Sequence, residues 1–147
     1  MKISAKGRYG LAAMVYMTQY LAADCVTVSK ISEDLGISKI YLEQVFALLK
    51  KAGLVTSIKG SSGGYQLSRP PEEITAFDIL NAIEITLFEP AEAISSEKSS
   101  YINKALESLL WNDLDNMVKQ FLGSVTLDKL SNEAVKNLVN NEYMYYI

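Results

Sequence analysis

The segment 38–51 carries side chains that could recognise base edges and phosphates of duplex DNA. Gln44 can donate to and accept from adenine, Glu43 can accept from the amino group of cytosine, and Ile40 suits a thymine methyl. Lysines more often hold phosphates than read bases. The candidate DNA-binding residues of this segment are Ser38, Lys39, Ile40, Tyr41, Glu43, Gln44, Lys50 and Lys51. This mixture is what the outer face of a recognition helix requires.

A second candidate contact is the glycine-rich basic loop 59–64, which lies between two strand-like runs, 54–58 and 65–68. Lys59 can enter a narrow minor groove, where the negative potential is enhanced. The glycines allow a close backbone approach and a positive φ. Glycine-rich hairpin loops occur in many β proteins, so the loop alone favours DNA binding only weakly. Its candidate DNA-binding residues are Lys59, Gly60, Ser61, Ser62, Gly63 and Gly64.

The first of three helices that must position these sites is predicted over residues 5–23. Its expected apolar face comprises Leu11, Met14, Val15, Leu21 and Ala22. Lys6 and Arg8 lie in its first turn, where the helix dipole disfavours cations. A nearby phosphate would explain these two residues, which are therefore further candidates for DNA binding, and so would a plain solvated helix end.

Two shorter helices follow, at 28–35 and 39–52, separated by a turn at 36–38. Thr27 is the expected N-cap of the first, and Ser38 can cap the second. Gly36 permits the left-handed turn between them, and Gly53 ends the last helix. The residues of that helix expected to be buried are Leu42, Val45, Leu49 and Ala52. This order predicts a mainly α fold with a small β-hairpin, namely a winged helix-turn-helix domain plus a long dimerisation helix.

Charge is distributed unevenly along the chain. Its net charge of −3 would normally argue against a nucleic-acid partner. Residues 1–70, however, contain nine Lys/Arg against four Asp/Glu, a net of +5, whereas residues 71–147 contain five against thirteen, a net of −8. A basic half can neutralise phosphates and gain from counterion release. The alternative is a chance segregation of charges on a solvated surface.

The composition disfavours several other classes of function. The chain has no histidine, so the commonest general base and metal ligand is missing, and we expect no enzyme activity, metal or cofactor. No run approaches the ~18 apolar residues of a membrane span, the first residues show no apolar signal core, and the expected location is cytoplasmic. A small enzyme and a protein–protein adaptor that has lost DNA binding remain as alternatives. Salt-sensitive binding to duplex DNA separates them from a DNA-binding regulator.

The single cysteine, Cys25, lies in the connection between the first two helices. One cysteine rules out an internal disulfide framework. Cys25 is a candidate redox sensor because it is close to the DNA-binding unit. A buried and inert thiol is the alternative.

Several motifs in register resemble those of the BadM/IscR/CymR-type regulators, often called the Rrf-two family, and the first of them resembles the family's N-terminal signature. They are Lys2-Ile3-Ser4-Ala5-Lys6-Gly7-Arg8-Tyr9-Gly10-Leu11, Tyr41-Leu42-Glu43-Gln44, Ala52-Gly53-Leu54-Val55 and Gly63-Gly64-Tyr65. The resemblance covers essentially the whole chain in order. It implies a homodimeric winged-helix repressor, with one recognition helix and one wing on each half of a pseudo-palindromic double-stranded operator.

Two departures from that family bear on mechanism. Its iron–sulfur members place three cysteines in the loop before the long helix, whereas the corresponding loop here, about 86–100, contains neither cysteine nor histidine. A thiolate-held cluster cannot be built there. The wing also has Lys59 where arginine is usual, which keeps the charge but weakens a planar bidentate contact.

The second half of the chain is expected to join two copies. A helix capped by Thr75 and Asp78 should run to about Glu84, and a helix of about 33 Å should span 101–122. The long helix has an apolar band too wide for one core-facing stripe, and a second copy would cover it. The candidate dimerisation residues are Ile102, Leu106, Leu109, Leu110, Leu114, Met117 and Phe121. A monomer whose tail folds over the helix is the alternative.

The expected organisation is a winged helix-turn-helix DNA-binding domain at 1–85, a linker loop at 86–100, and a dimerisation helix with a C-terminal tail at 101–147. The apolar tail resembles that of the cluster-free, cysteine-metabolism repressors of the family. Tyr145, Tyr146 and Ile147 are therefore candidate docking residues for O-acetylserine sulfhydrylase, which binds a C-terminal isoleucine of serine acetyltransferases. Aromatic residues packed against the dimer helix are the alternative.

Overall fold

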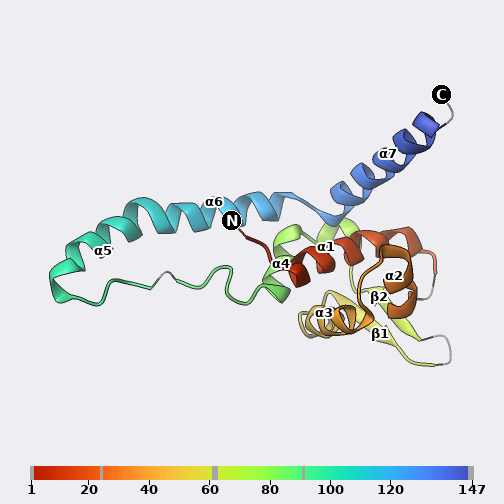
Figure 1. The fold of residues 1–147 in the computed structure, drawn as a ribbon, viewed down its shortest axis with the longest axis horizontal. Coiled ribbons are helices and arrows are strands. Elements are labelled where there is room, and N and C mark those ends of the chain that lie inside the picture. Colours follow the sequence, from red (N-terminus) through yellow and green to blue (C-terminus); the bar gives the residue numbers. More distant parts are fainter. Residues whose placement is uncertain (1, 24, 61–62, 91, 146–147) are drawn as a thin grey trace.

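The computed structural model describes residues 2–23, 25–60, 63–90 and 92–145. It is mostly helical, with one two-stranded antiparallel hairpin, as predicted. Helices α1–α4, within residues 5–83, form one packed unit with the hairpin (Figure 1). Helices α5–α6, within residues 100–124, and α7, residues 127–145, project from this unit in different directions. Within the described ranges, no helix is both long and apolar enough to cross a membrane.

Helix α1 (Ala5–Met17) begins at Ser4, whose side chain accepts a hydrogen bond from the Gly7 amide at 3.1 Å. The backbone and hydroxyl of Ser4 donate to Oε1 of Glu84 at 2.8 and 2.5 Å. A carboxylate at this position complements the positive end of the helix dipole. Helix α1 ends earlier than predicted, because a 3₁₀ turn (Thr18–Tyr20) follows it.

The predicted apolar face of the first helix was therefore partly wrong. Met14 is buried, and Leu11 and Val15 are half-buried against the core, but Leu21 is 58% exposed and Ala22 is exposed too. The 3₁₀ turn has about three residues per turn rather than 3.6. The residues after Met17 are thereby rotated off the face that the α-helical period predicts.

Helix α2 (Val28–Leu35) is capped by the Thr27 side chain, which accepts from the Lys30 amide at 3.1 Å. Gly36 adopts the predicted left-handed conformation, with φ 66°. Ser38 stands at the N-cap position of α3 (Lys39–Lys51), but its side chain makes no capping hydrogen bond, contrary to the prediction. Helix α3 buries Leu42, Val45 and Leu49 as predicted. It also buries Phe46, whereas Ala52 is exposed.

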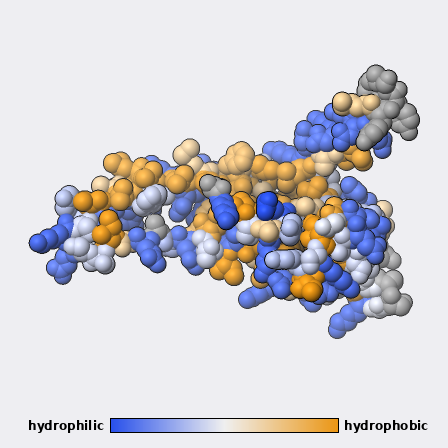
Figure 2. All heavy atoms as spheres, in the orientation of Figure 1, coloured by the Kyte–Doolittle hydropathy of each residue, from blue (hydrophilic) through white to orange (hydrophobic). Residues whose placement is uncertain are grey.

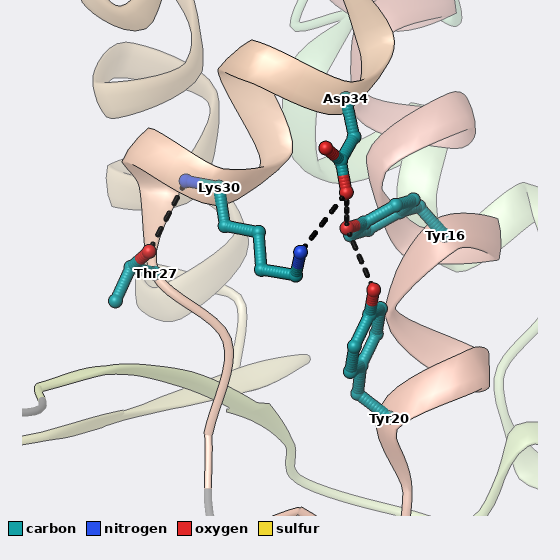
Figure 3. Close-up of polar contacts among 5 residues, drawn as sticks. All are labelled: Tyr16, Tyr20, Thr27, Lys30 and Asp34. Carbon is teal, nitrogen blue, oxygen red and sulfur yellow. Dashed lines mark hydrogen bonds and ion pairs between the residues drawn. The ribbon is translucent and has the colours of Figure 1, made fainter.

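Helices α1 and α2 are joined by a side-chain network (Figure 3). The Tyr16 hydroxyl donates to Oδ2 of Asp34, so Tyr20, at 2.9 Å, must be the donor to Tyr16. Nζ of Lys30 lies 3.3 Å from Asp34 and 5.8 Å from the centre of the Tyr20 ring. Burial and the bond to Asp34 raise the pKa of Tyr16. The bonds from Tyr16 and Lys30 lower the pKa of Asp34, and Asp34 raises the pKa of Lys30.

The hairpin consists of β1 (Val55–Ile58) and β2 (Gly64–Leu67), with Thr56 opposite Gln66. Val26 and Tyr65 exchange two backbone hydrogen bonds of 2.9 and 2.8 Å, so the hairpin is tied to the connection before α2. A Cβ on Gly64 would come within 2.4 Å of the Val26 carbonyl oxygen. Gly60 has a positive φ of 134°, as predicted. Gly63 and Gly64 do not, so the positive φ predicted for these two residues was wrong. They are accommodated as glycines because a Cβ at either position would clash with neighbouring backbone atoms.

Helix α4 (Ala76–Ile83) follows a 3₁₀ turn (Pro71–Glu73) and has the predicted capping box between Thr75 and Asp78. The segment predicted as a C-terminal tail instead forms helix α7 (Leu127–Tyr145). Its first residue, Leu127, is fully buried, and its amide donates to the Ile74 carbonyl at 2.7 Å. The chain thus returns to the packed unit of α1–α4 and the hairpin after the long helix.

The long helix consists of α5 (Ser100–Leu106), a π-helical turn (Glu107–Trp111) and α6 (Asn112–Ser124). A 3₁₀ turn (Glu97–Ser99) precedes it. Apolar residues recur every four positions, at Ile102, Leu106, Leu110 and Leu114. On a helix of about 3.6 residues per turn, side chains at this spacing would drift around the helix axis. The wider π turn reduces this drift. Figure 2 shows an apolar band along this helix.

Candidate nucleic-acid interface

The outward face of α3 is open to solvent along its whole length. Ile40 is 68% exposed, and Glu43, Gln44, Lys50 and Lys51 are exposed as well. The opposite side of the helix is anchored by the buried residues described above. Because α3 is held rigidly on one side, its outer side chains form a surface with fixed spacing, as reading a DNA groove requires.

The first turns of α1 and α3 lie against each other. The rings of Tyr9 and Tyr41 meet edge-to-face, with centroids 6.0 Å apart and planes at 77°. Tyr41 is nevertheless 44% exposed, Arg8 is exposed and Lys6 is half-buried. The structure therefore brings the cations at the start of α1 next to the start of α3. Sequence reasoning included Tyr41 but missed its contact with Tyr9.

The wing is held beside α3 by aromatic stacking between Phe46 and Tyr65, whose ring centroids are 4.7 Å apart. Lys59 and Gly60 are exposed at the end of the hairpin. Gly63 and Gly64 are half-buried, so they belong to the packing of the hairpin rather than to its exposed surface. The predicted contacts Ser61 and Ser62 lie outside the described residues. The hairpin thus presents Lys59 from the same rigid unit as α3.

The cations of this surface carry no intramolecular counter-charge in the part of the chain that the structure describes. There, the two ion pairs join Lys30 to Asp34 and Arg69 to Asp78, the latter at 3.5 Å. Neither involves Lys39, Lys50, Lys51 or Lys59. These four lysines can bind phosphates without first breaking either of these ion pairs.

Cys25 lies on another part of the same unit. It is half-buried and lines a hollow of about 80 Å³ between the end of α1 and the hairpin, together with Met17, Tyr20, Tyr65 and Leu67. The hollow adjoins Tyr65, the residue that stacks on α3. Cys25 therefore lies near Tyr65, whose ring stacks on Phe46 and so holds the hairpin beside α3.

The loop 86–100 does not offer the donors of an iron–sulfur cluster. It contains no cysteine and no histidine, and the described residues include no group of three or more His, Cys, Asp or Glu side chains placed to hold a metal ion. The second part of the loop is held by the side-chain amide of Asn103 on α5. This amide accepts a hydrogen bond of 3.2 Å from the Ile94 backbone N–H and donates one of 2.8 Å to the Ile94 carbonyl. The residues present do not fit a thiolate-held cluster.

The predicted dimerisation residues are mostly uncovered. Leu109 is 79% exposed, and Leu106 is the one half-buried member of the set. Trp111, which the prediction omitted, is also exposed and lies at the end of the π turn. Of the predicted docking residues, Tyr145 closes α7, whereas Tyr146 and Ile147 lie outside the described residues.

Comparison with known proteins gives one consistent result. The Rrf2 family, described as "Iron-dependent Transcriptional regulator", matches residues 3–133. CymR of Bacillus subtilis is 35% identical over 147 residues, which covers 100% of both chains. IscR of Pectobacterium atrosepticum is 34% identical over 143 residues, or 97% of this chain and 87% of IscR.

Solved structures agree with the sequence relatives. The structure of B. subtilis CymR, described as the global cysteine regulator, matches with a TM-score of 0.73 and 35% identity over 90% of this chain and 98% of CymR. The oxidized form of Staphylococcus aureus CymR matches with a TM-score of 0.68 and 37% identity, over 89% and 96% of the two chains. This chain therefore belongs to the Rrf2 family of DNA-binding transcriptional regulators.

Proposed function

We propose that the protein is a homodimeric, cluster-free repressor that binds a pseudo-palindromic operator through α3 and the wing. The observation that carries the proposal is the open face of α3, on which base-reading and cationic side chains stand without internal counter-charges in the described chain. Such a surface supplies both terms of sequence-specific binding. Phosphate contacts give affinity, and base contacts give specificity.

The roles divide by chemistry and position. Ile40, Glu43 and Gln44 contact base edges in the major groove. Lys39, Lys50 and Lys51 hold phosphates, and Lys6 and Arg8 extend this contact from the start of α1. Lys59 enters the adjoining minor groove from the wing.

The dimer forms through the long helix. Monomeric soluble proteins rarely leave a large contiguous apolar surface in water, and the band on α5–α6 contains eight large apolar residues that are exposed. These residues are Tyr101, Ile102, Leu109, Leu110, Trp111, Leu114, Met117 and Phe121. A two-fold pair of such helices would match the two-fold symmetry of the operator. The division into residues 1–85, 86–100 and 101–147 stays a prediction, with α7 added to the last part.

The proposed absence of a cluster rests on the donor set of the loop 86–100, although the family as a whole is described as iron-dependent. Protein purified without oxygen from iron-replete cells should contain less than stoichiometric iron and sulfide and show no charge-transfer absorption. Stoichiometric iron with DNA binding that depends on it would overturn this part of the proposal.

Control of cysteine or sulfur metabolism is the finer proposal. It is supported by the end-to-end similarity to CymR, which is described as a global cysteine regulator. In this proposal, Tyr145, Tyr146 and Ile147 dock into O-acetylserine sulfhydrylase, and residues 137–142 of α7, all exposed, leave the enzyme room to approach. Calorimetry of the enzyme with the full chain and with a chain lacking Ile147 tests this. Equal affinities would contradict docking.

A thiol-responsive regulator is the second candidate, favoured by the position of Cys25 beside Tyr65 and by the oxidized form of a similar structure. Peroxide should then weaken operator binding, and a thiol reductant should restore it. The variant Cys25→Ser should not respond. Equal peroxide responses of both proteins would remove Cys25 from the mechanism.

The proposed function is tested by selecting bound sites from fragmented genomic DNA with the full chain. We expect an inverted repeat whose half-sites are about one helical turn, or a multiple of it, apart. Enrichment of single, asymmetric sites would contradict the dimeric operator complex. Binding without sequence preference would contradict the assignment of the α3 side chains.

A further inference from the structure

The end of α4 lies against the beginning of α1 (Figure 1). Oε1 of Glu84, the C-cap residue of α4, accepts hydrogen bonds from the backbone N–H and the hydroxyl of Ser4 at 2.8 and 2.5 Å. The Ser4 oxygen in turn accepts from the Gly7 amide at 3.1 Å. A carboxylate 80 positions away in sequence therefore takes part in the cap of α1.

Two glycines of α1 make room for this contact. A Cβ on Gly7 would collide with Oε1 of Glu84, and a Cβ on Gly10 would collide with Cδ1 of Ile83. Both glycines are buried and lie inside a helix, where glycine is less favourable than alanine. The beginning of α1 is thus built for the close approach of α4 at the expense of helix propensity.

The contact lies beside the cations at the start of α1. Lys6 is half-buried and Arg8 is exposed, and Tyr9, the next residue, meets Tyr41 of α3 edge-to-face. The two ion pairs in the described part of the chain involve neither Lys6 nor Arg8, so Glu84 does not neutralise them there. The beginning of α1 is therefore held from α4 by Glu84 and from α3 by Tyr41, while its cations stay available to DNA.

We propose that Glu84 is a positioning residue for DNA binding, which fixes Ser4 and thereby holds the cations of α1 where they meet the operator backbone. The inference rests on the proposed contact of Lys6 and Arg8 with phosphates. By its charge alone, a carboxylate near phosphates would weaken DNA binding. The contribution of Glu84 therefore comes from the hydrogen bonds that it accepts, which order the first turn before DNA arrives and reduce the entropy lost on binding.

Two substitutions of Glu84 separate its hydrogen bonds from its charge. Glu84→Gln keeps an oxygen that can accept from Ser4 and removes the charge, whereas Glu84→Ala removes both. Titrated with a duplex that contains the inverted repeat selected from genomic DNA, Glu84→Ala should bind about tenfold more weakly, because the cationic side chains must then be ordered during binding. Glu84→Gln should bind at least as tightly as the parent. Glu89→Ala, an exposed acidic position in the loop 86–100, is the matched control and should not weaken binding.

The dependence on salt and on the cations distinguishes positioning from a purely structural role. Glu84→Ala should flatten the slope of log K against log salt by about one, as the loss of a phosphate contact does. In a chain that already carries Lys6→Ala and Arg8→Ala, it should cost little further affinity. If that double variant binds like the parent, the proposed phosphate contact of α1 fails, and the inference with it. If the double variant is weakened but Glu84→Ala causes the same loss in both backgrounds, the contact stands and the inference is overturned.

Gly7→Ala tests the same contact without changing Glu84. Alanine is the better helix former, so this substitution favours the helical state of α1 while its Cβ displaces the carboxylate from Ser4. Operator affinity should therefore fall although the circular dichroism spectrum keeps its helical form. In a Glu84→Ala background the same change should have little effect, which separates displacement of the carboxylate from the contact of a Cβ at this position with Ile3. Unchanged operator affinity of folded Gly7→Ala would contradict the inference.

Discussion

The ring of Tyr65 on β2 stacks on the ring of Phe46 in α3, with centroids 4.7 Å apart and planes inclined by 29°. Phe46 is fully buried, whereas Tyr65 is half-buried at the base of the wing. The contact fixes the hairpin relative to the recognition helix. It therefore determines where Lys59 lies relative to the exposed face of α3.

Removing this stack should uncouple the wing from α3. We expect Tyr65→Ala to weaken operator binding and to reduce the additional effect of Lys59→Ala, because a loosely held wing no longer delivers its lysine. The measurement is a double-mutant cycle on operator affinity. Gln66→Ala, on the neighbouring exposed position of β2, is the control. Strict additivity of Tyr65→Ala and Lys59→Ala would contradict the coupling.

The Asp34 network should make stability depend on pH in the acidic range. The pKa of Asp34 is lowered in the folded protein by the bonds from Tyr16 and Lys30, so its contribution is present above the unfolded pKa of about 3.9 and is lost as the pH falls through the folded pKa. Asp34→Asn should thus be less stable than the parent at neutral pH, and the difference should shrink as the pH falls below about 4.

Urea denaturation of both proteins across this pH range checks the expectation, with Glu33→Gln on the same helix as a control. A stability difference that stays constant down to the acid limit would show that Asp34 acts through packing rather than charge.

Leu127 should matter for the stability of the DNA-binding unit, although it follows the long helix in sequence. Leu127→Ala should cost about 2–5 kcal/mol, the usual range for a leucine deleted from a packed core. Leu138→Ala, farther along α7 and exposed, should cost far less. Chemical denaturation of the two variants gives the comparison. Equal losses would contradict the docking of α7 onto the unit.

Much of the DNA-binding unit could be predicted because its signals are local. The capping residues Thr27 and Thr75, the glycine turn at Gly36 and the stripe of α3 depend on neighbours within one or two turns of helix. The end of α1 and the return of the chain at Leu127 could not be predicted in this way. They depend on contacts between distant segments, such as the hydrogen bond from Leu127 to Ile74.

The recognition surface shows the same difference. The exposure of Gln44 and Lys50 follows from helical spacing alone, whereas the pairing of Tyr9 with Tyr41 requires the packing of α1 against α3. The π turn at Glu107–Trp111 had no signal that a regular helical period could reveal. A strict four-residue repeat of apolar side chains is the one feature that could have indicated it.

A charge in the apolar band should separate dimerisation from folding. Met117→Glu should raise the dimer dissociation constant by at least a hundredfold while the circular dichroism spectrum keeps its helical form, because the band is exposed in the single chain. Operator affinity should fall as well, since one protomer can occupy only one half-site. Asn116→Glu lies on the same turn outside the band and is the matched control. An unchanged dimer in Met117→Glu would contradict the role of the band.

The central claim, that the wing supplies charge while α3 reads bases, is tested by titrating operator DNA with Lys59→Ala and Gln44→Ala over a range of salt concentrations and single base-pair changes. Lys59→Ala should weaken binding to all duplexes alike and flatten the slope of log K against log salt by about one. Gln44→Ala should leave that slope nearly unchanged and relax the base preference at one position in each half-site. Indistinguishable effects of the two substitutions would contradict this division of labour.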